Sequence, residues 1–146
     1  MYKPNNIIFQ STAALITFIL LGFAVYLLLA GHNSPGGGFV GGLTTSAAIL
    51  IMYMAYGESA VKKIIPINFI VLIPIGLLVA LLTGLGALLF QVPFLTHSFG
   101  VFHVPFIGPV ELATAMFFDL GVYFTVFGTT MTIILTIATD SREEEN

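Results

Sequence analysis

Two acidic side chains in the last apolar segment are the residues best suited to ion chemistry. Asp119 stands inside that segment, and Glu111 lies near its start, two residues after Pro109. A carboxylate among apolar residues is costly, so Asp119 invites a functional interpretation, in which it binds or relays a cation or a proton. The alternative is a protonated or paired Asp119 that holds helices together. For Glu111 the alternatives are a cation-attracting acid and an ordinary helix start, where proline and an acid are both favoured.

Threonines accompany Asp119 at helical spacing. The row comprises Thr114, Thr125, Thr129, Thr132 and Thr136, together with Gly121. On a helix that turns about 100° per residue, the row falls within about 80°. It predicts a packing face whose hydroxyls bond back to their own helix, or alternatively a polar wall beside an ion path. Asp119 points about 100–140° away from the row, so that one face packs within the chain and the other meets a different subunit. Tyr123, one turn after Asp119, is placed to hydrogen-bond it.

A glycine-rich run joins the first two apolar segments. It spans residues 31–42, and its candidate functional residues are His32, Asn33, Pro35, Gly36, Gly37, Gly38, Phe39, Gly41 and Gly42. So many glycines beside a proline indicate tight backbone geometry that side chains would block. The run therefore predicts backbone packed against backbone, or against a partner. It lacks the lysine and the strand–helix context of a phosphate-binding loop.

The composition indicates an integral membrane protein. Of 146 residues, 58% are hydrophobic and only 8% are charged, with a mean hydropathy of +1.05. Soluble domains carry about 25% charged residues. The chain has no basic patch, which argues against nucleic-acid binding, and no cysteine for disulfides or thiolate sites. His32, His97 and His103 show no metal-ligand spacing, and no nucleophile–base set is present, so we expect no metal, no cofactor and no enzymatic activity.

Four apolar segments are long enough to cross a membrane, which requires about 20 residues each. The sequence predicts a single all-α membrane domain over 1–146, with spans at about 7–30, 39–56, 67–90 and 110–139 and a tail at 140–146. The positive residues fall on one side of these spans, with one pair in the loop between the second and the third: Lys3, Lys62, Lys63 and Arg142. Positive residues favour the cytoplasm. We therefore expect both termini to be cytoplasmic and the glycine-rich run to lie outside.

Small residues at four-residue spacing mark two further packing grooves. The second span carries Gly38, Gly42 and Ser46, and the third carries Gly76, Ala80 and Gly84. Because helices in lipid associate through close packing of small residues, a neighbouring backbone is expected at each groove.

The run from His32 to Leu43 resembles the signature of the MnhB family, the B-type subunits of Mrp-type multisubunit cation/proton antiporters. The resemblance extends to the opening Asn6–Gln10 and to two late segments, Pro109–Thr114 and Phe118–Tyr123. The resemblance also includes the four predicted spans, which match those of the family in size. Relatives of this signature also occur as modules of membrane-bound hydrogenase complexes.

This resemblance implies a hetero-oligomer with other Mrp subunits in the lipid bilayer of a prokaryotic plasma membrane. Such complexes exchange cytoplasmic Na+ for external H+, and their proton-conducting Lys and Glu chains belong to the larger subunits. Function is then expected to depend on Pro35, Gly36, Gly37, Gly38 and Phe39. Three alternatives stay open: a module of a hydrogenase complex, a purely structural scaffold subunit, and a stand-alone homodimeric transporter.

Overall fold

The computed structural model of the protein describes residues 7–31, 36–89 and 108–143, and most of these residues lie in helices. The helices are α1 (Ile7–Ala30), α2 (Gly37–Tyr56), α3 (Glu58–Ile64), α4 (Phe69–Leu89) and α5 (Gly108–Glu143). Four of them are long and apolar enough to cross a membrane: Ile7–Ala30, Gly37–Tyr56, Phe69–Leu89 and Thr114–Ser141. The described residues thus confirm the prediction of an all-α protein with four helices long and apolar enough to cross a membrane.

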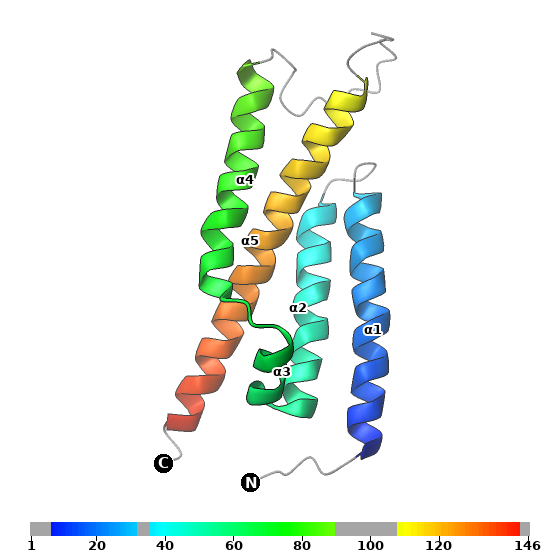
Figure 1. The fold of residues 1–146 in the computed structure, drawn as a ribbon, viewed down its shortest axis with the longest axis vertical. Helices are drawn as coiled ribbons and strands as arrows, with labels where there is room; N and C mark the ends of the chain where they lie inside the picture. Colours follow the sequence, from blue (N-terminus) through cyan, green and yellow to red (C-terminus); the bar gives the residue numbers. More distant parts are fainter. Residues whose placement is uncertain (1–6, 32–35, 90–107, 144–146) are drawn as a thin grey trace.

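The helices are arranged around a central pair, α2 and α5. α2 packs against both α1 and α5, and α5 packs in turn against α4. In Figure 1 the helices follow one another across the molecule in the order α4, α5, α2, α1. Within the described parts of the chain, α1 and α4 do not contact each other. α1 also touches α5 directly, so α5 is in contact with each of the other three long helices.

The outer helices, α1 and α4, expose most of their large apolar side chains. Phe18 on α1 is 78% exposed, and Leu89 at the end of α4 is 84% exposed. A helix that is apolar on all sides is stable only where its surroundings are apolar too. Their internal hydrogen bonds satisfy the backbone, so these surfaces suit contact with lipid or with another membrane helix.

The segment after α2 forms a short helix, α3, where the sequence predicted a loop carrying Lys62 and Lys63. Gly57 ends α2 with φ +83°, a left-handed conformation that favours glycine. Glu58 then occupies the first turn of α3, and the two lysines occupy its last turn. This charge order matches the helix dipole. α3 ends before Pro66, as the conformational restriction ahead of a proline requires.

A cluster of large apolar side chains packs together at the end of the molecule where α3 lies. It consists of Ile49, Tyr53, Val61, Phe69, Phe127 and Met131. The rings of Phe69 and Phe127 meet edge to face, with centroids 5.5 Å apart. Val61 and Met131 are fully buried. This apolar cluster therefore joins α2, α3, α4 and α5 by side-chain packing.

Candidate functional site

The start of α2 is built from the glycine-rich run. Gly36 has φ +98°, and its carbonyl accepts a hydrogen bond from the amide of Val40 at 2.9 Å. α2 therefore begins at Gly37, two residues before the expected start at 39. A Cβ on Gly31 would lie 2.5 Å from the Cα of Gly37, so the end of α1 and the start of α2 touch through their backbones. His32, Asn33 and Pro35 lie outside the described residues.

Two glycines on one face of α2 meet the backbone of α5. A Cβ on Gly38 would overlap the carbonyl oxygen of Asp119 and would lie 3.0 Å from the carbonyl carbon of Asp119. One turn later, a Cβ on Gly42 would lie 3.0 Å from the carbonyl oxygen of Tyr123. Both glycines are buried. The absence of side chains therefore allows α5 to approach α2 to backbone contact beside Asp119.

A third glycine marks the point where three helices meet. A Cβ on Gly41 would lie 3.2 Å from the carbonyl oxygen of Ala24 in α1 and 3.5 Å from Cδ2 of Tyr123 in α5. The Tyr123 ring and the backbone of α1 thus both lie close to Gly41. The spacing rule found Gly38 and Gly42, whereas Gly41 belongs to a second buried stripe of α2 with Thr45 and Ala48.

The hydroxyl groups of Tyr123 and Thr45 form a contact between α5 and α2. Their oxygens are 2.7 Å apart, and Thr45 Oγ1 also donates to the carbonyl of Gly41 at 2.9 Å. Thr45 is only 6% exposed. The structure therefore pairs the Tyr123 hydroxyl with Thr45, whereas the sequence suggested Asp119 as its partner.

The predicted ion-handling residues all lie on α5, but at different levels and in different surroundings. Asp119 is half-buried beside the first turn of α2. Glu111 belongs to the first turns of α5, about 12 Å from Asp119 along the helix axis. Thr125 and Thr129 are half-buried one to three turns beyond Asp119. These residues share a helix without converging on one point.

The threonine row of α5 borders the crossing with α4. The hydroxyls of Thr125, Thr132 and Thr136 donate to carbonyls four residues earlier in α5, at 2.9, 2.7 and 2.7 Å. This is the bonding that the packing-face interpretation predicts. A Cβ on Gly76 of α4 would lie 2.5 Å from Thr125 Oγ1, and one on Gly121 would lie 2.6 Å from the amide of Ala80. α4 and α5 therefore also cross through small residues.

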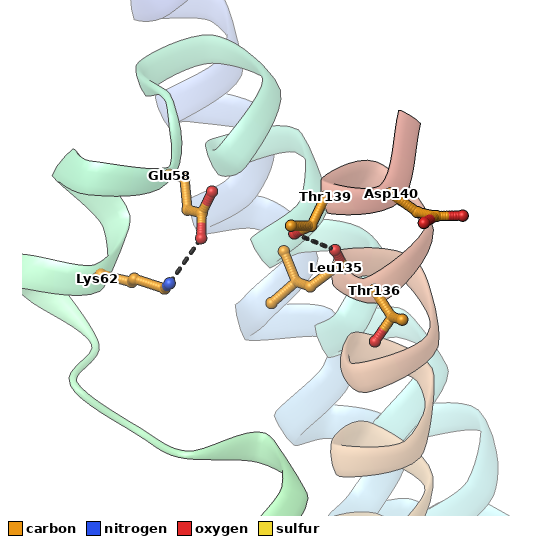
Figure 2. Close-up of a pocket in the computed structure, with 6 residues that line it drawn as sticks. All are labelled: Glu58, Lys62, Leu135, Thr136, Thr139 and Asp140. Carbon is orange, nitrogen blue, oxygen red and sulfur yellow. Dashed lines mark hydrogen bonds and ion pairs between the residues drawn. The ribbon is translucent and has the colours of Figure 1, made fainter. Parts of the chain in front are cut away.

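A cleft of about 370 Å³ lies between α3 and α5 at the opposite end of the molecule from the start of α2. Its walls are formed by Glu58, Lys62, Leu135, Thr136, Thr139 and Asp140. Glu58 pairs with Lys62 at 2.6 Å, and this bond raises the pKa of Lys62 above its ordinary value. Figure 2 shows Asp140 extending away from Glu58. The two carboxylates do not converge, and no group of three metal-ligating side chains occurs among the described residues.

Comparison with known proteins places the chain in a family. A family model described as "Domain related to MnhB subunit of Na+/H+ antiporter" matches residues 8–132. The chain belongs to the MnhB family. The matched region of this MnhB-family chain includes the glycine-rich run, the Thr45–Tyr123 pair and Asp119.

Its curated relatives match over nearly their whole length. The B-type Na+/H+ antiporter subunit of Bacillus subtilis is 54% identical over 92% of this chain and 94% of the relative. The protein of the same name from Alkalihalophilus pseudofirmus is 49% identical over 94% and 96%. "Putative antiporter subunit mnhB2" of Staphylococcus aureus strain Newman is 37% identical over 93% and 96%.

Proposed function

We propose that this chain is the B-type subunit of an Mrp-type Na+/H+ antiporter, a hetero-oligomer in a prokaryotic plasma membrane that exchanges cytoplasmic Na+ for external H+. The observation that carries the proposal is the 54% identity to a B-type antiporter subunit across 92% of the chain. The four membrane-spanning helices are consistent with it. Because proton-conducting chains belong to larger subunits in complexes of this type, a single carboxylate away from the ends of the described spans, Asp119, suits an accessory membrane subunit.

In this proposal residues 1–146 form one four-helix membrane domain with both termini and the 140–146 tail in the cytoplasm. The start of α1, α3 and the end of α5 lie at the same end of the molecule (Figure 1). Lys62 and Lys63 on α3 are exposed at that end. Positive residues near spans favour the cytoplasmic side, which leaves the start of α2 on the outer side.

Asp119 is the residue that we propose handles the ion. It is half-buried in the outer half of the proposed orientation, and its backbone meets the first turn of α2. The partial positive charge at a helix start favours a nearby anion. An ionised Asp119 can attract a cation, with Glu111 nearer the outer surface and the hydroxyls of Thr125 and Thr129 further along α5.

A structural scaffold without ion contact is the second candidate, and the glycine contacts favour it. The backbones of α2 and α5 touch at Gly38 and Gly42, so these residues are needed for packing whatever Asp119 does. A scaffold predicts that bulky substitutions there abolish assembly while changes at Asp119 do little. The two candidates therefore differ in the expected role of the Asp119 charge.

The proposal is tested by purifying the tagged chain from its native membrane in mild detergent and identifying its partners by mass spectrometry. We expect large antiporter-type subunits in fixed ratio, and we expect vesicles lacking this chain to lose Na+-dependent H+ exchange. Hydrogenase subunits in the same preparation would assign the chain to a redox-driven complex. Recovery of the chain alone, with antiport activity in liposomes, would support a stand-alone transporter.

A further inference from the structure

We infer that Tyr123 is a positioning residue for Asp119, because its hydroxyl bond to Thr45 sets the register of α5 against the start of α2. The inference deepens the proposed function and rests on it, since that register affects transport only if Asp119 handles the ion. Asp119 and Tyr123 are four residues apart, which places them on neighbouring turns of one helix face.

Tyr123 contacts α2 through three different parts of its structure. Its carbonyl oxygen lies against Gly42, the edge of its ring lies against Gly41, and its hydroxyl meets Thr45 at 2.7 Å. The ring also stacks on Phe127 with centroids 6.3 Å apart. The backbone, the ring and the hydroxyl of Tyr123 therefore all contact α2, one turn from Asp119.

The direction of the hydroxyl bond follows from the buried partner. Thr45 has one hydroxyl proton, which it donates to the Gly41 carbonyl at 2.9 Å. Tyr123 is therefore the donor to Thr45. Because Thr45 is 6% exposed, water has little access to replace a lost partner. Removing either hydroxyl removes the same bond.

The hydrogen bond adds a directional restraint to the glycine contacts. Gly38 and Gly42 present only backbone to α5, and these van der Waals contacts depend less on direction than a hydrogen bond between defined atoms does. Loss of the bond removes this restraint one turn from Asp119. A small shift of α5 at this level then moves Asp119 relative to Gly38 and the helix start.

The test uses the purified complex reconstituted in proteoliposomes. The variants are Tyr123→Phe, which keeps the ring, Thr45→Val, and the double variant. Thr83→Val is the matched control, because within the described part of the chain the half-buried Thr83 hydroxyl bonds back to Val79 in its own helix, at 2.6 Å. Antiport is measured against Na+ concentration, and the amount of assembled complex is measured in parallel.

We expect each single variant to raise the apparent KM for Na+ about three- to twentyfold, the range that interhelical hydrogen bonds in membranes imply. The double variant should match the singles, because both remove one bond. Assembly should be unchanged, and Thr83→Val should behave as wild type. A loss of complex with an unchanged KM, or effects that add in the double variant, overturns the inference.

Asp119→Asn in the same series separates this inference from the function on which it rests. If Asp119→Asn impairs Na+-dependent antiport while Tyr123→Phe and Thr45→Val match the control, only the positioning role is wrong. If Asp119→Asn exchanges Na+ normally, the ion-handling proposal is wrong, and the positioning role is wrong with it.

Discussion

The crossing of α2 and α5 at Gly38 and the apolar cluster near α3 hold helices together by different means. At the crossing, Gly38 and Gly42 bring backbones into contact, and Tyr123 and Thr45 add one part-buried hydrogen bond. In the cluster, large side chains such as Phe127 and Met131 interdigitate. Backbone contact leaves no side chain to adjust, whereas packed side chains can relax. The crossing should therefore tolerate little change, and it is also the region that holds Asp119.

The largest effect is expected from a bulky residue at the crossing. Gly38→Leu places a side chain where the Asp119 carbonyl lies, so we expect assembly of the complex to be abolished, as judged by native gel electrophoresis. Gly22→Leu on α1 is the matched control, since a Cβ there meets nothing within 4 Å. Normal assembly of Gly38→Leu would show that the crossing is looser than the structure indicates.

The next largest effect is expected in the apolar cluster. Met131 is fully buried, and Met131→Ala should lower the free energy of unfolding by about 2–5 kcal/mol, the usual cost of such a cavity. Thermal unfolding in detergent measures the loss. Because Met131 lies twelve residues, about 18 Å along α5, from Asp119, the apparent KM for Na+ of the surviving complex should not change. A raised KM would contradict the separation of the two regions.

Two tyrosines allow a matched comparison between the regions. The Tyr53 hydroxyl is buried in the cluster and has no hydrogen-bond partner among the described residues, whereas Tyr123 is bonded to Thr45. Tyr53→Phe removes an unsatisfied polar group and should leave stability unchanged or raise it. Tyr123→Phe should lower it by about 0.6 kcal/mol. Equal effects in thermal unfolding would argue against a distinct polar contact at the crossing.

The smallest effect is expected at the ion pair on α3. Glu58 raises the pKa of Lys62, which is exposed, so the pair contributes little to stability and is screened by solvent. Because the pKa of Lys62 is raised in the folded state, the pair's contribution to the free energy of unfolding is complete below the pKa of an unfolded-state lysine, about 10.4. The contribution disappears as pH rises through the pKa of Lys62 in the folded state. The small difference in melting temperature between wild type and Lys62→Gln should be constant from pH 8 to about 10 and vanish above that. A difference that disappears between pH 6 and 8 would require another titrating group.

The sequence predicted the spans because twenty apolar residues in a row have few other stable arrangements. It predicted that small residues mark helix crossings. Spacing alone does not tell which helix packs against these small residues, and only the structure shows that α5 packs against Gly38. α3 was missed because seven residues carry too short a pattern to separate a helix from a loop. The acidic Glu58 ahead of the basic Lys62 was the feature of the sequence that indicated a helix here.

The Thr45–Tyr123 bond could not be predicted, since the two residues are 78 positions apart. Thr45 resembled the other threonines that bond back to their own helix, and it does so as well. Its second contact depends on the close approach that Gly41 and Gly42 allow. For the candidate site, the sequence therefore identified the acidic residues and the glycines. The structure was needed to show that the crossing of α2 and α5 places Gly38 against Asp119.

The most direct test of the account is the Na+ dependence of antiport in proteoliposomes that hold the complex with Asp119→Asn, at an amount of complex equal to wild type. Asparagine keeps the size of the side chain and removes its charge. The account predicts that antiport is lost or that the apparent KM for Na+ rises at least about tenfold, which corresponds to about 1.4 kcal/mol. An unchanged Na+ dependence would contradict it and leave this chain a scaffold whose glycines serve packing alone.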